Sequence, residues 1–153
     1  GFQSAQFRKV EAILGRRDSR MAGHLPPDMQ EEIAEITSRN SIWDSFLDYL
    51  TKRGYTLPTD VISRDKSVAY VSNPAVQDVL LKVHQSDPES AMVSERLVDI
   101  DEGIQEWRYR HVKMVERTIG HKMGTGGSSG VEYLASTLFN PVFKDLWEIR
   151  SRF

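Results

Sequence analysis

The chain has 153 residues, which is enough for one domain with a hydrophobic core. Its 20 basic and 22 acidic residues give a net charge of −2, which argues against a nucleic-acid-binding protein and against attachment to a membrane by a basic patch. The absence of cysteine excludes disulfides, thiolate metal sites, iron–sulfur clusters and cysteine nucleophiles.

The first residues of the chain suggest that it is a piece of a larger protein. Residue 1 is Gly1 rather than methionine, and Phe2 already belongs to a helical pattern. We therefore expect that a functional site can be divided between this chain and sequence that precedes it. The sequence has neither a signal peptide at its start nor an apolar stretch near the roughly 20 residues that a membrane helix needs, so we expect a cytoplasmic protein.

Three helices are predicted in the first third of the chain. Phe2 to Leu14 carries apolar residues at helical spacing, and Gly15 suits the C′ position that follows. The Pro26–Pro27 pair fits the first turn of a second helix. Ser41 is the expected N-cap of a third, and Gly54 is its expected end.

The remainder of the chain is also predicted to be mainly helical. Tyr55 to Ser72 has no clear period and predicts a long ordered loop, in which Val68 to Val71 is the single candidate for a short strand. Asn73 and Pro74 open a fourth helix. We expect short closing helices at Val131 to Leu138 and at Phe143 to Ile149.

The longest predicted helix covers Asp87 to Ile119. Asp87 is the expected N-cap, Pro88 occupies the first helical position, and Glu89 places an acid in the first turn. At 1.5 Å per residue the helix is roughly 45–50 Å long, which exceeds the width of a small domain. The sequence therefore predicts an all-α helical bundle built around one long helix that crosses a domain or subunit boundary.

This helix carries a histidine, His111, on its predicted inward face. Steps of four and three residues along one face connect Val93, Leu97, Ile100, Ile104, Trp107, His111, Met114 and Thr118. A lone histidine on such a face is more often a core residue whose two ring nitrogens are hydrogen-bonded to neighbours. Here Trp107 and Met114 flank it by one turn, a glycine-rich run follows the helix, and cations crowd the same segment: Arg108, Arg110, Lys113 and Arg117.

These features favour a metal or haem site at His111, because a neutral imidazole with one unprotonated nitrogen is an axial ligand of haem iron. The other three histidines, His24, His84 and His121, have no partners at ligand spacing, and neither HExxH nor ExxH occurs. The run from Gly124 to Gly130 is not a P-loop, because no GK[ST] follows it. It remains open as a connector, a phosphate-binding nest before the next helix, or a lid over a small ligand.

Three blocks of the sequence resemble signature blocks of the tryptophan 2,3-dioxygenase family. Gly1 to Arg8 reads GFQSAQFR, Trp107 to His111 reads WRYRH, and Gly120 to Gly130 reads GHKMGTGGSSG. Their order and spacing match, and the resemblance covers essentially the whole chain. It implies an all-α helical-bundle haem protein of the tryptophan/indoleamine dioxygenase type.

The resemblance also implies an activity, a cofactor and partners. Members of the family are oxidoreductases, usually homotetramers, that convert L-tryptophan and O2 to N-formylkynurenine. This is the first step of tryptophan catabolism by the kynurenine pathway. The cofactor is haem b, whose iron is ferrous in the active state, and neither nucleic acid nor a membrane is an expected partner.

By motif match, the resemblance gives roles to residues of this chain. His111 is the axial ligand of the haem iron, Arg8 lies near a haem propionate, and Thr125 with Gly124 contacts the amino acid head group of the substrate. Phe7 belongs to the part of the motif that borders the pocket, as does Gly1.

No catalytic residue is expected within this chain. The family places a distal histidine and the arginine for the substrate carboxylate before Gly1. Residues 1–153 are therefore expected to form a single all-α unit, the C-terminal part of a larger subunit. Either a second polypeptide supplies the missing N-terminal part, or this chain is a fragment that is inactive by itself. The alternatives are a non-catalytic helical oligomerisation module, which uses the long helix and an aromatic tail, and a phosphate-ligand binder, which uses the glycine-rich run.

Overall fold

A computed structural model describes residues 5–18, 25–120, 122 and 130–153, and every structural statement here concerns those residues. Within them the fold is all-α, as the sequence predicts. The elements are α1 (Ala5–Leu14), α2 (Pro27–Thr37), α3 (Ile42–Lys52), α4 (Thr59–Ile62), α5 (Pro74–Ser86), α6 (Pro88–Ile119), α7 (Gly130–Ser136), α8 (Lys144–Glu148) and a final 3-10 helix, η2 (Ile149–Arg152).

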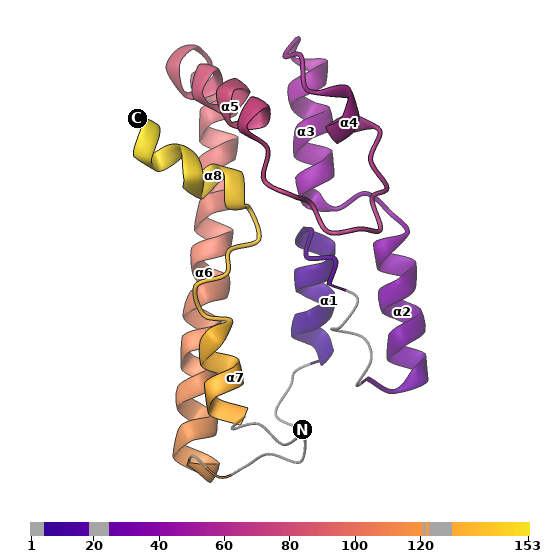
Figure 1. Cartoon of the computed structure of the whole chain (residues 1–153), viewed down its shortest axis with the longest axis vertical. Helices are drawn as coiled ribbons and strands as arrows, with labels where there is room; N and C mark the ends of the chain where they lie inside the picture. The colour runs from indigo at the N-terminus through magenta and orange to yellow at the C-terminus, as the bar shows by residue number, and fades with distance from the viewer. Residues whose placement is uncertain (1–4, 19–24, 121, 123–129) are drawn as a thin grey trace.

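Helix α6 runs along one side of the molecule for most of its length (Figure 1). At 32 residues it is about 48 Å long. Helices α5 and α8 pack against its first half, and α7 lies beside its second half. Helix α1 packs against α2 and α3 on the other side of the molecule.

Local capping interactions set most helix boundaries close to their predicted positions. Asp87 accepts a hydrogen bond from the Ser90 amide and caps α6, as predicted. Gly15 follows α1 with a φ of +137°, which favours glycine. A Cβ at Gly15 would also lie 3.3 Å from Trp43 Cβ, so this glycine lets the end of α1 approach α3 closely.

The predicted loop before α5 differs in two ways from expectation. It contains one short helix, α4, and Val68 to Val71 does not form a strand in the described structure. The Asp65 carboxylate accepts a hydrogen bond from the Ser67 amide, and Arg64 donates to the Val68 carbonyl. These local bonds favour a turn over an extended pairing segment.

Two hydrophobic clusters stabilise the bundle. The larger one joins α3, α5, α8 and the first half of α6, and its most deeply buried members are Leu50, Val76, Leu80, Val83, Phe143, Leu146 and Ile149. The smaller one joins the second half of α6 to α7 through Val112, Val115 and Val131. Each fully buried aliphatic side chain contributes about 1.5–3 kcal/mol of hydrophobic free energy.

The inward face of α6 is rotated relative to the predicted stripe. Leu97 and Ile104 are buried, as predicted, but four of the predicted inward residues are between 36% and 47% exposed: Val93, Ile100, Trp107 and Met114. Polar residues take inward positions instead: Ser90, Ser94, Asp101 and Arg108. A pattern of apolar residues alone therefore gives the wrong face.

Asp101 faces inward because it caps the segment that leads into α8. Its carboxylate accepts hydrogen bonds from the amides of Val142 and Phe143, each at 2.9 Å, and from Trp147 Nε1 at 3.0 Å. These three hydrogen bonds offset the free-energy cost of removing the carboxylate from water.

A buried ion pair between Arg108 and Glu11 connects α6 to α1. Both side chains are less than a tenth exposed. The same Glu11 carboxylate accepts Arg16 Nη1 at 3.2 Å. Arg108 Nη1 also donates to the carbonyls of Thr137 and Asn140, at 3.2 and 2.8 Å, just after α7 ends. One guanidinium therefore ties together α1, α6 and the segment after α7.

At the start of α3, Ser41 and Asp44 form a reciprocal capping box. Asp44 also pairs with Arg64 and Lys66. Burial alone would raise the pKa of Asp44, but the hydrogen bonds from Ser41 and the charges of Arg64 and Lys66 outweigh it and lower that pKa below 3.8. No helix in the described part of the chain is long and apolar enough to cross a membrane.

We predict that Glu11→Gln lowers the free energy of unfolding by about 3–5 kcal/mol, because it leaves the buried guanidinium of Arg108 and the partly buried one of Arg16 without their carboxylate. Urea denaturation followed by far-UV circular dichroism measures the change. The control is Glu106→Gln, which removes an exposed partner of Arg110 and should change stability by about 0.5 kcal/mol or less. Equal effects of the two substitutions would contradict the role given to Glu11.

We predict that Asp44→Asn reduces the acid sensitivity of the fold. The pKa of Asp44 is lower in the folded chain than in the unfolded one, so its stabilisation is present above about pH 4 and is lost as the pH falls below that value. Unfolding free energies of the two proteins should therefore converge as the pH falls from neutral. An acid transition of unchanged slope in Asp44→Asn would contradict this prediction.

Candidate functional site

His111 lies on α6, one turn after Trp107, and is half-buried. The two rings are stacked, with centroids 4.8 Å apart and planes inclined by 10°. Their spacing of four residues places both side chains on the same side of the helix. The indole therefore restricts the rotation of the imidazole.

Phe7 of α1 stacks on the same indole. The Phe7 and Trp107 centroids are 3.6 Å apart and the planes differ by 13°. Two of the predicted site residues, Phe7 and His111, therefore both contact the side chain of Trp107. Together the three rings form a stack that joins the start of α1 to the second half of α6.

The nitrogens of His111 make no hydrogen bond with any residue that the structure describes. His111 is therefore not a core histidine with both nitrogens hydrogen-bonded, which was the alternative interpretation of its position. His84, by contrast, lies beside Glu95 and the Phe153 ring at the far end of the bundle, and burial lowers its pKa. An imidazole nitrogen without a protein partner is available as a metal ligand.

A single histidine such as His111 is compatible with haem iron, which takes most of its ligands from the porphyrin. The described residues contain no group of three or more histidine, aspartate or glutamate side chains that could hold a metal ion by themselves. A metal bound at His111 must therefore have further ligands from elsewhere, as haem iron has. The flat faces of Trp107 and Phe7 provide apolar surface beside the imidazole.

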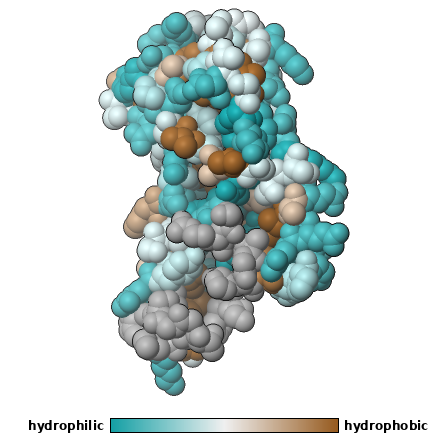
Figure 2. All heavy atoms as spheres, turned by 45° about the vertical axis from the view of Figure 1, so that its right-hand side comes forward, coloured by the Kyte–Doolittle hydropathy of each residue, from teal (hydrophilic) through white to brown (hydrophobic). Residues whose placement is uncertain are grey.

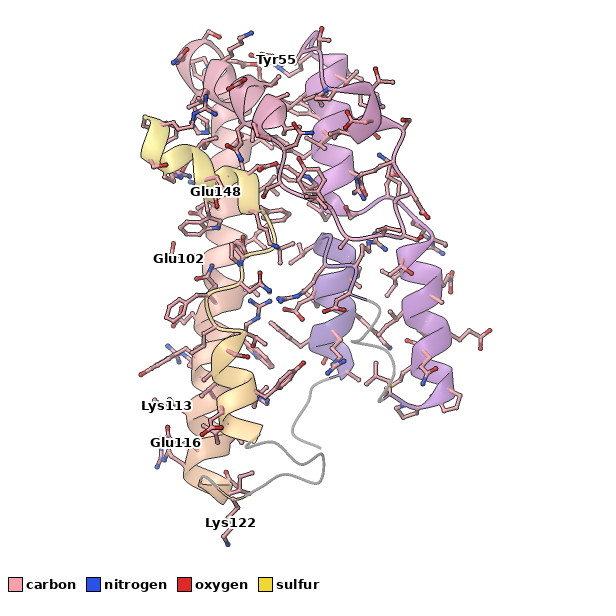
Figure 3. All side chains as sticks on the ribbon, in the orientation of Figure 1. Tyr55, Glu102, Lys113, Glu116, Lys122 and Glu148 are labelled. Atoms are coloured by element: carbon pink, nitrogen blue, oxygen red, sulfur yellow. The ribbon has the colours of Figure 1, made fainter. Side chains whose placement is uncertain are left out.

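The cations of α6 do not gather around His111 as their sequence positions suggested. Arg108 forms a buried ion pair with Glu11. Arg110 pairs with Glu106, and Lys113 pairs with Glu116 at 2.8 Å. Figure 3 shows the labelled Lys113 and Glu116 side chains on the outer side of α6, away from α1.

Comparison with known proteins adds to this geometry. A family model described as tryptophan 2,3-dioxygenase matches residues 84–153. The chain is 55% identical to a tryptophan 2,3-dioxygenase of Anaeromyxobacter dehalogenans and 50% identical to one of Herpetosiphon aurantiacus, with 98% and 99% of this chain aligned. A third relative of the same name, from Kineococcus radiotolerans, is 38% identical over 99% of the chain. The chain belongs to the tryptophan 2,3-dioxygenase family.

The chain spans only part of its relatives' length, namely 57%, 58% and 54% of these three tryptophan 2,3-dioxygenases. The alignments nevertheless cover both α1 and α6, because they include nearly all of this chain. The stack of Phe7, Trp107 and His111 therefore lies within the region of similarity to the family.

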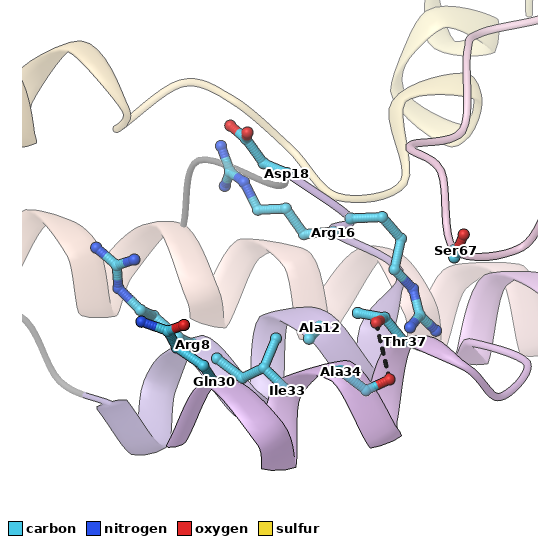
Figure 4. Close-up of a pocket in the computed structure, with 10 residues that line it drawn as sticks. Arg8, Ala12, Arg16, Asp18, Gln30, Ile33, Ala34, Thr37 and Ser67 are labelled. Carbon is cyan, nitrogen blue, oxygen red and sulfur yellow. Dashed lines mark hydrogen bonds between the residues drawn. The ribbon is translucent and has the colours of Figure 1, made fainter. Parts of the chain in front are cut away.

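Arg8, the predicted propionate partner of this tryptophan 2,3-dioxygenase family member, lies on α1 and is half-buried. It lines a cavity of about 250 Å³ between α1 and α2, together with Arg16 and Arg17 (Figure 4). The predicted substrate contacts Gly124 and Thr125, and the pocket residue Gly1, lie outside the described residues.

Sequence reasoning about this family member missed the buried ion pair that supports the site. Glu11 follows Phe7 by four residues and precedes Leu14 by three, so it lies on the apolar face of α1. A charged residue on such a face signals a buried partner. The pattern could have identified Glu11 as buried, but not Arg108 as its partner.

We predict that Phe7 and Trp107 are energetically coupled by about 1 kcal/mol, the usual magnitude for a stacked aromatic pair beyond its buried area. The measurement is a double-mutant cycle of Phe7→Leu, Trp107→Leu and the combined variant, by urea denaturation. A control cycle pairs Phe7→Leu with Phe153→Leu. Phe153 directly follows η2 and contacts His84, so the changes in unfolding free energy of these two substitutions should be additive. Additivity in the Phe7–Trp107 cycle would rule out the stack in solution.

Proposed function

We propose that this chain forms the haem-binding, C-terminal part of a tryptophan 2,3-dioxygenase. That enzyme is a haem-dependent oxidoreductase that converts L-tryptophan and O2 to N-formylkynurenine at the start of the kynurenine pathway. The observation that carries the proposal is the imidazole of His111, which has no hydrogen-bond partner among the described residues, in a chain that is 55% identical to a tryptophan 2,3-dioxygenase.

In this proposal His111 donates a nitrogen lone pair to the iron of haem b. When bound in its ferrous form, haem b supplies dioxygen binding and activation. Trp107 limits the rotation of the imidazole through their stacking contact. Glu11 and Arg108 fix the position of this part of α6 relative to α1, so the ligand is held before the cofactor arrives.

Other residues of the chain complete the proposed site. Thr125 and Gly124 hold the amino acid head group of the substrate, and Arg8 attracts a haem propionate. Phe7 borders the pocket, as does Gly1. The distal histidine and the arginine for the substrate carboxylate come from sequence outside residues 1–153, so the chain has no catalytic residue of its own and is inactive alone.

We also propose that the whole protein is a cytoplasmic homotetramer. Four partly exposed residues recur at seven-residue intervals along α6, which is the spacing of a helix–helix contact: Val93, Ile100, Trp107 and Met114. The same observation favours the second candidate function, a non-catalytic assembly module. On the part of the face that Figure 2 colours by hydropathy, hydrophobic side chains form small patches separated by hydrophilic ones.

We predict that His111→Ala abolishes the Soret band of the full-length protein reconstituted with haem, because the iron loses its protein ligand. The absorption spectrum and the haem content per chain measure this. His84→Ala is the control, since His84 lies on α5 and contacts Phe153, and it should leave the spectrum unchanged. An unaltered spectrum in His111→Ala would remove this residue from the role, and a haem-free wild-type protein would favour the assembly module.

We predict that Thr125→Ala weakens the binding of L-tryptophan much more than the binding of haem, because the hydroxyl contacts the substrate head group only. A spectroscopic titration of the haem-loaded protein with tryptophan gives the dissociation constant. Removal of one hydrogen bond to a charged group corresponds to about 1.5–3 kcal/mol, or roughly 10- to 150-fold in affinity. Equal tryptophan affinity in both proteins would contradict the assignment.

A further inference from the structure

The cavity between α1 and α2 has an unusual concentration of arginine. It has a volume of about 250 Å³, and Arg8, Arg16 and Arg17 line it, with Asp18 as the one acidic residue among its described lining (Figure 4). The rest of the described lining is apolar or uncharged, including Ala12, Ile33 and Ala34. Charges inside such a partly enclosed space interact more strongly than charges in water.

Arg17 is the most deeply buried of these arginines, with 6% of its surface exposed. Its Nη1 and Nη2 each donate to a carbonyl at the end of α2, Ile36 O and Arg39 O, at 3.0 Å. Its Nε is buried and has no hydrogen-bond partner within the described part of the chain. No carboxylate of the described residues pairs with it, and burial lowers its pKa. A buried guanidinium in this condition is unfavourable unless an anion accompanies it.

Asp18 is the acidic residue of the cavity's described lining, and the carboxylates of Glu11 and Asp44 are each shared by two other cations. Glu11 forms ion pairs with both Arg16 and Arg108. Asp44 forms ion pairs with both Arg64 and Lys66. When its partly buried side chains are included, this region holds more positive charge than negative, although the whole chain has a net charge of −2. The positive residues are Arg16, Arg17, Arg64, Lys66 and Arg108, and the negative ones are Glu11, Asp18 and Asp44.

We propose that this cavity binds a small oxyanion of the phosphate class, with Arg17 as its central ligand. Arg17 lines the cavity and has one donor, Nε, without a partner among the described residues, and Arg16 adds positive charge at the wall. The volume corresponds to about eight water molecules at about 30 Å³ each, so a phosphate fits with part of its hydration shell. The site does not include His111, and it binds its anion whether or not haem is present.

The first experiment is a phosphate titration of the haem-free, 153-residue chain at constant ionic strength, with sodium chloride as the balancing salt. Isothermal titration calorimetry and thermal denaturation should both give a saturable response. Arg17→Gln should weaken phosphate binding at least about tenfold, which is the loss of one charge-assisted hydrogen bond. The control is Arg39→Gln. Arg39 is an exposed arginine just after α2, and its side chain pairs with Glu35.

A second variant keeps the test valid if Arg17→Gln does not fold. Ala34 is exposed and lines the cavity, so Ala34→Leu narrows the cavity without a change in charge. This variant should keep the helical content of the parent and lose phosphate binding. A response that rises linearly with phosphate, or equal affinities in Arg17→Gln, Arg39→Gln and the parent, would overturn the proposal.

The final experiment tests whether the cavity binds a free anion or a haem propionate, since both carry negatively charged oxygens. Phosphate affinity is measured in the full-length protein without haem, with haem, and with haem dimethyl ester, whose propionates are uncharged. Equal affinities in all three states are expected. Loss of phosphate binding with haem, but not with its ester, would assign the arginines to the cofactor and overturn a separate site. Absence of a Soret band would instead overturn the proposed dioxygenase function and leave the phosphate result standing.

Discussion

The buried contact between Glu11 and Arg108 holds together the two helices that carry the candidate site. Helix α1 packs mainly against α2 and α3, so its connection to α6 depends on side chains rather than on close helix packing. Two such connections exist side by side, the ion pair and the stack of Phe7 on Trp107. They act through different physics, because the first is electrostatic and directional and the second is mainly hydrophobic.

This arrangement fixes the base of the His111 side chain and leaves its tip available. Arg108 precedes His111 by three residues on one rigid helix, so a restraint at Arg108 also restrains His111. The imidazole itself touches Trp107 and makes no hydrogen bond in the described structure. A ligand that is positioned by its backbone and one stacking neighbour can bind a metal without first breaking a hydrogen bond, which is the condition of a pre-organised site.

The sequence predicted what local interactions determine. Helix ends at Gly15, Ser41 and Asp87 were correct, because caps involve residues within a few positions of one another. The inward face of α6 was not correct, because charged residues such as Asp101 and Arg108 rarely face inward unless they have buried partners. Those partners lie 41 to 46 residues away for Asp101 and 97 away for Arg108 and Glu11, and periodicity within one helix carries no information about them. His111 could be proposed from the sequence, whereas the stacking of Phe7 on its neighbour Trp107 required the fold.

The same non-local pairing explains why the cations of this chain are easily misjudged. Two arginines that are two positions apart have different environments: Arg110 is exposed and paired within its own helix, whereas Arg108 is buried and paired across the molecule. Arg17 belongs to neither class, since its guanidinium is buried against carbonyls and its Nε is without a partner. Folded chains normally pair buried charges, and departures from that rule concentrate where a ligand completes the set. An anion in the α1–α2 cavity would make Arg17 follow the rule, just as iron would complete the bonding of His111.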